Sequence, residues 1–218
     1  MIKKKVVSEI TTKSTKSSKE LILLVILAAS ISTDDLNKID SALKKLKIAK
    51  VNALKIYETI LHCYLFCGFP AVIESLKLFK KEFENFKLNS SPYNVQKFNK
   101  YGKINCKLVY KNNYKKLIDN MQYLSPDIKE WMIIEGYGKV MNRPGLSMLE
   151  REFVTVSILS TRFYKDQLHS HIKGCLNLNA SYVNVKYILS KIKHITGSEN
   201  YEKTLKLLNH ILRAGKFS

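Results

Sequence analysis

The segment DQLHSHIKGCLNLNAS, residues 166–181, gathers several side chains that could do chemistry. His169 and His171 stand two residues apart, and Cys175 follows. On a helix, residues two apart point about 200° away from each other, so the two histidines cannot bind one metal ion together. His171 and Cys175 share a face at a spacing of four, but a zinc site would need further ligands from elsewhere. No metal is therefore expected, and acid–base chemistry at His171 is the sharper hypothesis.

A carboxylate that could work with His171 lies nineteen residues earlier, at Glu152 in LEREFVTVSILS. If these segments form consecutive helices, Glu152 and His171 could meet across the hairpin, and the carboxylate would orient the imidazole or share its proton. Alternatives stay open. Glu152 could be a first-turn carboxylate that suits the helix dipole, and His171 could be a core or interface histidine.

Charge and length limit the class of protein. The 218 residues are 45% hydrophobic and carry a formal charge of +19, which suits one large or two small globular domains. The positive charge comes mostly from scattered lysines rather than from arginines gathered with aromatic residues. A solvated surface is thus favoured over specific nucleic-acid binding.

Cysteine usage and the apolar run at residues 21–30 bear on location. The sequence has four cysteines but no C-x-x-C motif, which suggests reduced thiols in a cytoplasmic protein. The run LILLVILAAS at 21–30 follows Lys19-Glu20 and is too short to span a bilayer. We expect a buried helix there rather than a secretion signal, and no membrane partner.

The segments of the chain that must position these residues have the sequence patterns of helices. Apolar residues repeat at helical spacing in DDLNKIDSALKKLK, and NALKIYETILHCYLFC begins at an asparagine cap and stops at Gly68. Another helix is predicted from a Ser125 cap to Gly136, with Trp131 packing against the segments on both sides. Apolar and polar residues hardly ever alternate one by one, as they would in a half-buried strand, so the predicted fold class is all-α.

The two ends of the chain resemble each other at an offset of about 129–132 residues. LEREFVTVSILS corresponds to SKELILLVILAA, with Glu152 matched to Glu20, and Gly197 corresponds to Gly68. We therefore predict a flexible N-terminal arm (1–18), a first helical repeat (19–84), a connector (85–148) and a second repeat (149–218).

ETILHCYLFCGFPAVIESLKLF, taken with LEREFVTVSILS and QLHSHIKGCLNLNAS, resembles the carboxymuconolactone decarboxylase family of the alkylhydroperoxidase D-like superfamily, in its tandem-repeat form. The resemblance implies an all-α fold of two such repeats with a helical connector. It also implies a homo-oligomer, either a trimer or a dimer of tandem chains.

The resemblance carries the family's chemistry over only in part. The peroxidase branch has a Glu, a C-x-x-C and then a His, and Glu152 and His171 stand at the first and last of these positions. Tyr164 and Gln167 occupy the two thiol positions, so thiol-based peroxide reduction lacks both sulfurs. Ala42 stands at the His position of the first repeat, which therefore looks structural.

The function implied by the decarboxylase branch is a lyase that acts on a small carboxylated lactone, with Glu152 and His171 as catalytic residues and no cofactor. Arg151 and Arg162 could hold a substrate carboxylate, and Tyr164 is a further candidate contact. For the two arginines, exposed ion pairing is an alternative. Two other functions remain: a non-catalytic helical oligomer, and an atypical peroxidase with antioxidant activity. A cleft lined by Glu152 and His171 would favour the lyase, and tight burial would favour the non-catalytic protein.

Overall fold

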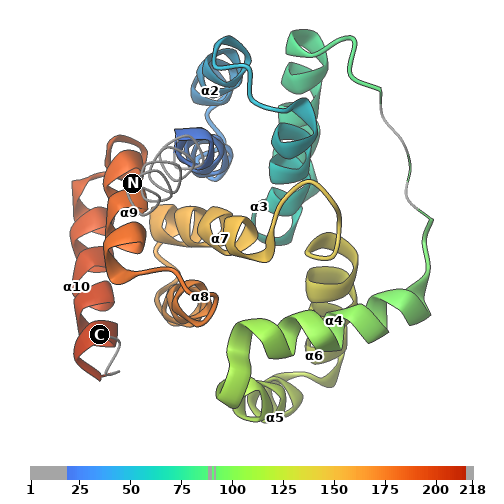
Figure 1. The fold of residues 1–218 in the computed structure, drawn as a ribbon, viewed down its shortest axis with the longest axis vertical. Helices are drawn as coiled ribbons and strands as arrows, with labels where there is room; N and C mark the ends of the chain where they lie inside the picture. Colours follow the sequence, from blue (N-terminus) through green and yellow to red (C-terminus); the bar gives the residue numbers. More distant parts are fainter. Residues whose placement is uncertain (1–18, 88–89, 91, 215–218) are drawn as a thin grey trace, which may run out of the picture.

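The structure, a computed structural model, describes residues 19–87, 90 and 92–214 (Figure 1). Throughout this part of the chain the ordered elements are helices, and no strand occurs in it, so the predicted all-α class is confirmed. The predicted N-terminal arm, residues 1–18, lies outside the described residues.

The first helical unit, residues 19–82, consists of a helix over 19–31, α2 (Leu36–Ile48) and α3 (Ala53–Glu82). Asn52 caps α3 by accepting a hydrogen bond from the backbone N–H of Leu54, as its residue type predicted. Gly68, with φ 80° and ψ 177°, breaks α3 into two helices at the predicted stop. Leu24, Leu27 and Ile31 are fully buried, which confirms a buried helix over the apolar run.

The second helical unit, residues 148–214, consists of α7 (Met148–Arg162), α8 (Lys165–Asn177), α9 (Tyr182–Thr196) and α10 (Ser198–Ala214). Ser147 and Glu150 form a reciprocal capping box at the start of α7. Ten consecutive residues of α7, 151–160, are buried. Figure 1 shows why: α7 lies at the centre, with α3 on one side and α8, α9 and α10 on the other.

Three residues with positive φ in the first unit have counterparts in the second unit at a fixed spacing. Positive φ angles at Asp34, Lys50 and Gly68 recur 129 residues later, at Phe163, Asn179 and Gly197. At this spacing Glu152 corresponds to Leu23, three residues after Glu20, with which the sequence comparison matched it. A shift of three is less than one helical turn and leaves the apolar stripe on nearly the same face, so periodicity cannot detect it.

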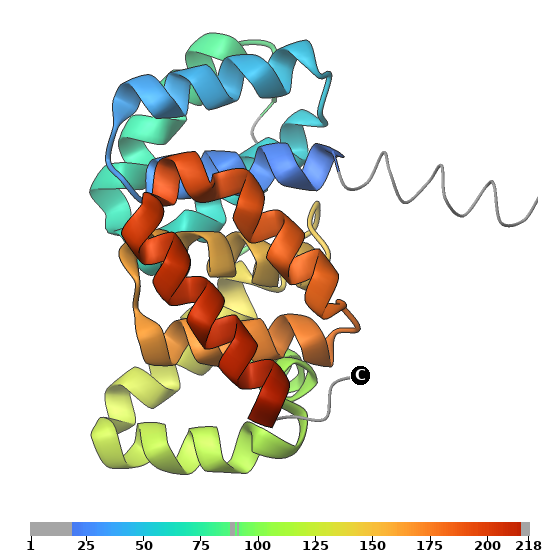
Figure 2. The same ribbon diagram turned by 90° about the vertical axis from the view of Figure 1, so that its left-hand side faces the viewer.

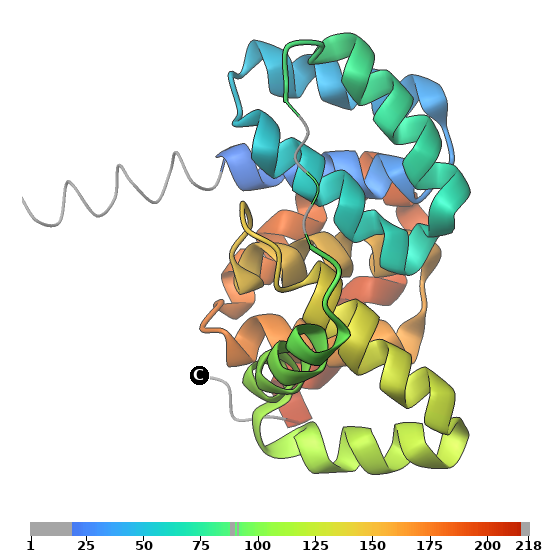
Figure 3. The same cartoon turned by 90° about the vertical axis from the view of Figure 1, so that its right-hand side faces the viewer.

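The connector between the units forms a layer of its own (Figures 2 and 3), in which the segments after residue 94 are helical. These elements are α4 (Val95–Tyr110), the 3₁₀ turn η1 (Lys111–Asn113), α5 (Tyr114–Leu124), α6 (Pro126–Trp131) and the π-helix η2 (Met132–Val140). α4 crosses η2 so closely that a Cβ atom on Gly102 would collide with the backbone of Ile133.

Two predictions for the connector were wrong. The helix that Ser125 caps does not end at Gly136 but continues as η2 to Val140, because a mid-helix glycine lowers helix stability without forcing a stop. Trp131 is 60% exposed and does not pack against both units. The packing role belongs instead to Ile133 and Tyr137, which join Cys106 and Val109 in a small second core.

α3 is the helix in the described part that is long and apolar enough to cross a membrane by length and composition alone. It is interrupted by Gly68 in its middle, and it carries the buried polar residues Glu58 and His62. Its neighbours in the structure are α2 and α7, so it has the contacts of a core helix.

Candidate functional site

Glu152 and His171 meet in the interior, where α7 and α8 pack against each other. Glu152 Oε2 lies 2.9 Å from His171 Nδ1, so the contact predicted from their types and spacing is present. The Glu152 side chain is fully buried, and His171 is 9% exposed. A carboxylate at Nδ1 fixes the ring orientation and leaves Nε2 as the atom free to exchange a proton. The catalytic role of the pair stays a prediction.

Gly174 makes room for this pair. A Cβ atom there would run into the carboxylate of Glu152 and crowd Val109. Gly174 lies three residues after His171 on the buried face of α8. The absence of a side chain at this position therefore lets the Glu152 carboxylate lie against α8 and reach the imidazole.

A buried ion-pair network joins α7 to α3 and to the turn that precedes α7. Arg143 donates hydrogen bonds to the Glu58 carboxylate at 2.9–3.0 Å. Arg151 Nη2 donates to Glu58 Oε2 at 3.2 Å and to the backbone carbonyl of Arg143 at 2.8 Å. Glu58 and Arg151 are both fully buried. The alternative of exposed ion pairing was thus wrong for Arg151, because α7 is covered on all sides.

His62 on α3 completes the group. Its Nε2 lies 2.8 Å from Thr155 Oγ1 on α7. Burial, and to a lesser extent the positive charges of Arg151 and His171, hold the pKa of His62 well below its usual 6.5. His62 is therefore a neutral hydrogen-bonding group at neutral pH. The ring of Phe66 lies 5.9 Å from the rings of both His62 and His171.

We call these residues the polar cluster: Glu58, His62, Arg151, Glu152, Thr155 and His171. Several buried atoms of the cluster find no hydrogen-bond partner among the described residues, namely His62 Nδ1, Arg151 Nε, Arg151 Nη1 and Glu152 Oε1. Buried polar atoms without partners cost about 1–3 kcal/mol each, so this set is unusual for a purely structural interior. The cluster therefore has unpaired donors on the cationic side chain of Arg151 and an unpaired acceptor on the carboxylate of Glu152.

The negative charge of Glu152 also affects the pKa of two buried thiols, Cys106 on α4 and Cys175 on α8. Burial, and secondarily Glu152, raise the pKa of the Cys106 thiol to about 12. The same two causes raise the pKa of Cys175. These thiols are therefore protonated and poor nucleophiles at neutral pH. In α3 the pKa of Cys67 is lowered, chiefly by a hydrogen bond from Cys63.

The structure does not bring Arg162 or Tyr164 to the pair. Arg162 is ten residues beyond Glu152, about 15 Å along α7. It donates to the carbonyl of Ser32 at 3.0 Å and lies 3.5 Å from Asp34, and so ties the two units together. Tyr164 is 51% exposed at the start of α8. Their roles in substrate binding stay predictions.

Two surface pockets lie near α8, and neither is lined by Glu152 or His171. One has a volume of about 610 Å³ and lies between α8 and α10, and a second of about 250 Å³ lies between α5 and α8. Both are lined by His169, on the opposite face of α8 from His171. Among the described residues, no three or more His, Cys, Asp or Glu side chains come together as metal ligands could.

Sequence reasoning missed Glu58, His62 and Arg143. A signal for the first two was present: Glu58 and His62 are four residues apart in an otherwise apolar helix, so both fall on one face that has to be buried. Arg143 stands in a turn, NRPG, whose path relative to α3 no local pattern reveals.

Fold and site together define an all-α protein with a buried carboxylate–histidine pair between consecutive helices. No family model matches the chain. Over 72 residues the chain is 25% identical to the 4-carboxymuconolactone decarboxylase of Acinetobacter baylyi. The match covers 33% of this chain and 54% of that enzyme, so the chain spans about half the length of this curated relative.

Proposed function

We propose that the chain is a carboxymuconolactone decarboxylase-like protein of two tandem helical repeats that acts as a lyase on a small carboxylated lactone. The observation that carries the proposal is the buried 2.9 Å contact of Glu152 with His171. The same helix, α7, also carries the buried and incompletely bonded guanidinium of Arg151. The similarity to a decarboxylase supports the substrate class. The 129-residue recurrence of positive φ angles supports the two repeats.

The chemistry would divide between these residues. Loss of CO2 leaves an electron pair on the former carboxylate-bearing carbon, which a conjugated lactone carbonyl can delocalise, and a proton must then be added to carbon. His171 would deliver that proton from Nε2 while Glu152 holds Nδ1. Arg151 would hold the negative charge of the substrate before and during the step.

The proposal extends to the assembly and its surroundings: a small-molecule substrate, a homo-oligomer (trimer or dimer), and a cytoplasmic location. Exposed apolar side chains on α5 and α6 support self-association, since Tyr123 is 95%, Leu124 70% and Trp131 60% exposed. These two helices bury none of their residues within the described chain.

A non-catalytic helical protein of this fold is the second candidate. The complete burial of Glu152, and the fact that neither described pocket is lined by Glu152 or His171, favour it. An atypical thiol peroxidase is the weaker alternative, because burial raises the pKa of Cys63, Cys106 and Cys175 and only that of Cys67 is lowered.

Turnover of a panel of carboxylated lactones tests the proposal. We expect the His171→Ala variant to lose about 10²-fold or more of the wild-type rate, because a positioned acid–base group contributes that much. His169→Ala is the matched control on the opposite face of α8 and should keep the rate. Unchanged turnover in His171→Ala would remove His171 from the mechanism. A folded wild-type protein that turns over no lactone would favour the non-catalytic candidate.

A further inference from the structure

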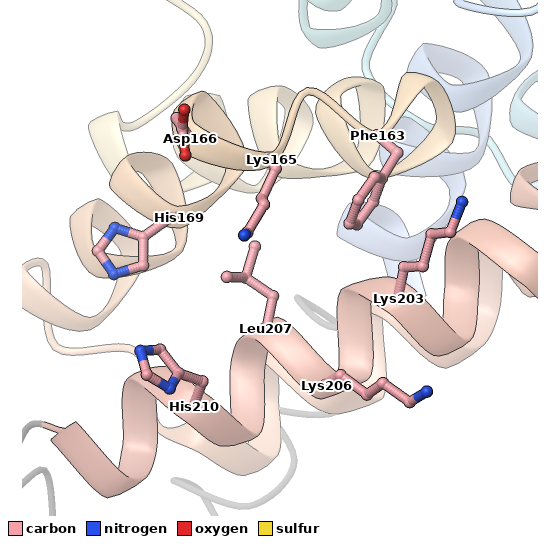
Figure 4. Close-up of a pocket in the computed structure, with 8 residues that line it drawn as sticks. All are labelled: Phe163, Lys165, Asp166, His169, Lys203, Lys206, Leu207 and His210. Carbon is pink, nitrogen blue, oxygen red and sulfur yellow. The ribbon is translucent and has the colours of Figure 1, made fainter.

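The pocket between α8 and α10 is separate from the polar cluster. Its volume is about 610 Å³, within the range of roughly 300–1,000 Å³ typical of small-molecule sites. His169 lines it, whereas His171 points to the core. The lining residues come from the end of α7, the first turns of α8 and the middle of α10, and are Phe163, Lys165, Asp166, His169, Lys203, Lys206, Leu207 and His210 (Figure 4).

The lining is rich in cations. Three lysines and two histidines face a single carboxylate, that of Asp166. Lys203 is paired with the exposed Glu199 at 2.6 Å. Lys165 and Lys206, in contrast, have no ion pair with any described residue. The positive potential of the pocket is therefore only partly compensated, and it favours an anionic occupant.

The pocket also has an apolar floor. Figure 4 shows the Lys165 side chain extending toward Leu207, with the Phe163 ring to the right of both. Leu207 is 7% exposed, and Lys203 Nζ stands 5.5 Å from the centre of the Phe163 ring. The positive φ of Phe163, which ends α7, places its ring here. A ligand with an apolar body would bury this ring, and inorganic phosphate would not.

His169 and His210 line one end of the pocket. His169 and His210 point toward each other from α8 and α10 (Figure 4). Burial, followed by the charges of Lys173 and His210, lowers the pKa of His169. His169 therefore supplies hydrogen bonding rather than charge at neutral pH, and the lysines carry the electrostatic attraction.

We propose that the pocket between α8 and α10 binds a small organic anion that carries two negative charges, as phosphate or carboxylate, on an aromatic or other apolar body. The lysine ammonium groups would attract the negative charges, the histidines would hydrogen-bond to them, and Phe163 and Leu207 would cover the apolar body. This site does not use Glu152 or His171, so it stands whether or not the lyase proposal holds.

Calorimetric titration of the full chain tests the proposal, at one fixed ionic strength. The probes are phenyl phosphate, isophthalate and inorganic phosphate, which are all close to doubly charged at about pH 8.5. We expect phenyl phosphate or isophthalate to bind one per chain, about tenfold more tightly than inorganic phosphate, because only they cover the apolar floor. Comparison of the two aromatic probes distinguishes a phosphate site from a carboxylate site.

Charge-matched double variants locate the binding. Lys165→Gln with Lys206→Gln should weaken binding of the tighter aromatic probe by about tenfold. Lys80→Gln with Lys81→Gln removes the same charge from the exposed end of α3 and should leave affinity within about twofold. His171→Ala should also leave it unchanged, which separates this site from the lyase proposal.

Three results would overturn the proposal. The first is equal weakening by both double variants, which would indicate general attraction to a chain of formal charge +19. The second is a failure of both aromatic probes to bind a folded protein. The third is binding of a single-stranded oligonucleotide alone, which would assign these lysines to a nucleic-acid surface.

Discussion

The first and second helical units have positive φ angles at matching positions but bury different side chains. Positive φ angles recur at a spacing of 129 residues, and so do the capping positions Asn52 and Ser181. At that spacing the polar residues of α7 and α8 fall on apolar residues of the first unit. Arg151, Glu152, Thr155 and His171 correspond to Ile22, Leu23, Ile26 and Ala42.

Glu58 and His62 of the first unit likewise have no buried polar counterparts in the second, as a comparison of α3 and α9 shows. Glu58 and His62 are buried on α3, where they face α7, while their counterparts in α9 are Tyr187, which is 44% exposed, and Lys191. The polar cluster therefore draws residues from both units. A repeated backbone does not by itself repeat a site, because the surroundings of each helix decide which of its faces is buried.

The largest expected effect comes from breaking the ion pair that joins the units. Arg151→Met should lower the free energy of unfolding by about 3–5 kcal/mol, because Glu58 loses its fully buried partner and keeps only the partly exposed Arg143. Glu20→Gln breaks the partly exposed pair with Lys55 in the first unit and should cost about 1 kcal/mol or less. Urea denaturation measures both. Equal losses would show that burial does not distinguish the two pairs.

The shared backbone predicts matched effects at Gly68 and Gly197. Both glycines have positive φ, 80° and 81°. A Cβ atom would make an ordinary 3.7 Å contact with Pro70 at Gly68 and would meet open space at Gly197, so alanine would cause backbone strain but no collision. Each substitution to alanine should cost about 1–3 kcal/mol of stability. If denaturant unfolding shows a loss at one glycine only, the two turns are not equivalent.

Gly174 is a position at which the two units differ in the side chain they must accommodate. Its counterpart in α2 is the exposed Lys45, which has no carboxylate to accommodate. Gly174→Ala should destabilise the protein by about 1–2 kcal/mol although alanine is the better helix former, because the new methyl group displaces Glu152. In a Glu152→Ala background the same change should be neutral or stabilising. A cost that persists in that background would point to Val109 instead.

The smallest effect is a pH dependence that comes from His62. Its pKa is depressed in the folded protein, while the unfolded chain binds a proton near pH 6.5. Stability from this group is therefore complete above pH 6.5 and is lost as pH falls below it, by up to about 1.4 kcal/mol per pH unit. His62→Gln should flatten the fall in stability between pH 7.5 and 5.5. His194→Gln, an exposed control, should not.

Local sequence determined the elements of this protein. Apolar periodicity, the asparagine and serine caps, and Gly68 define most helices and several of their ends, since capping and positive φ depend on a few neighbouring residues. Gly136 is the exception, because a glycine inside a helix does not force a stop. The pairing of Glu152 with His171 was also predictable, because consecutive helices joined by a short turn pack antiparallel.

Only the tertiary structure decided how completely the pair is buried and what surrounds it. Nothing local shows that α7 is enclosed on all sides, that Arg151 turns toward Glu58 on α3, or that His62 lies nearby. Those contacts join residues more than 85 positions apart, and their geometry depends on the packing of three helices at once. The pocket of His169 arises in the same way, from the placement of α10 beside the outer face of α8.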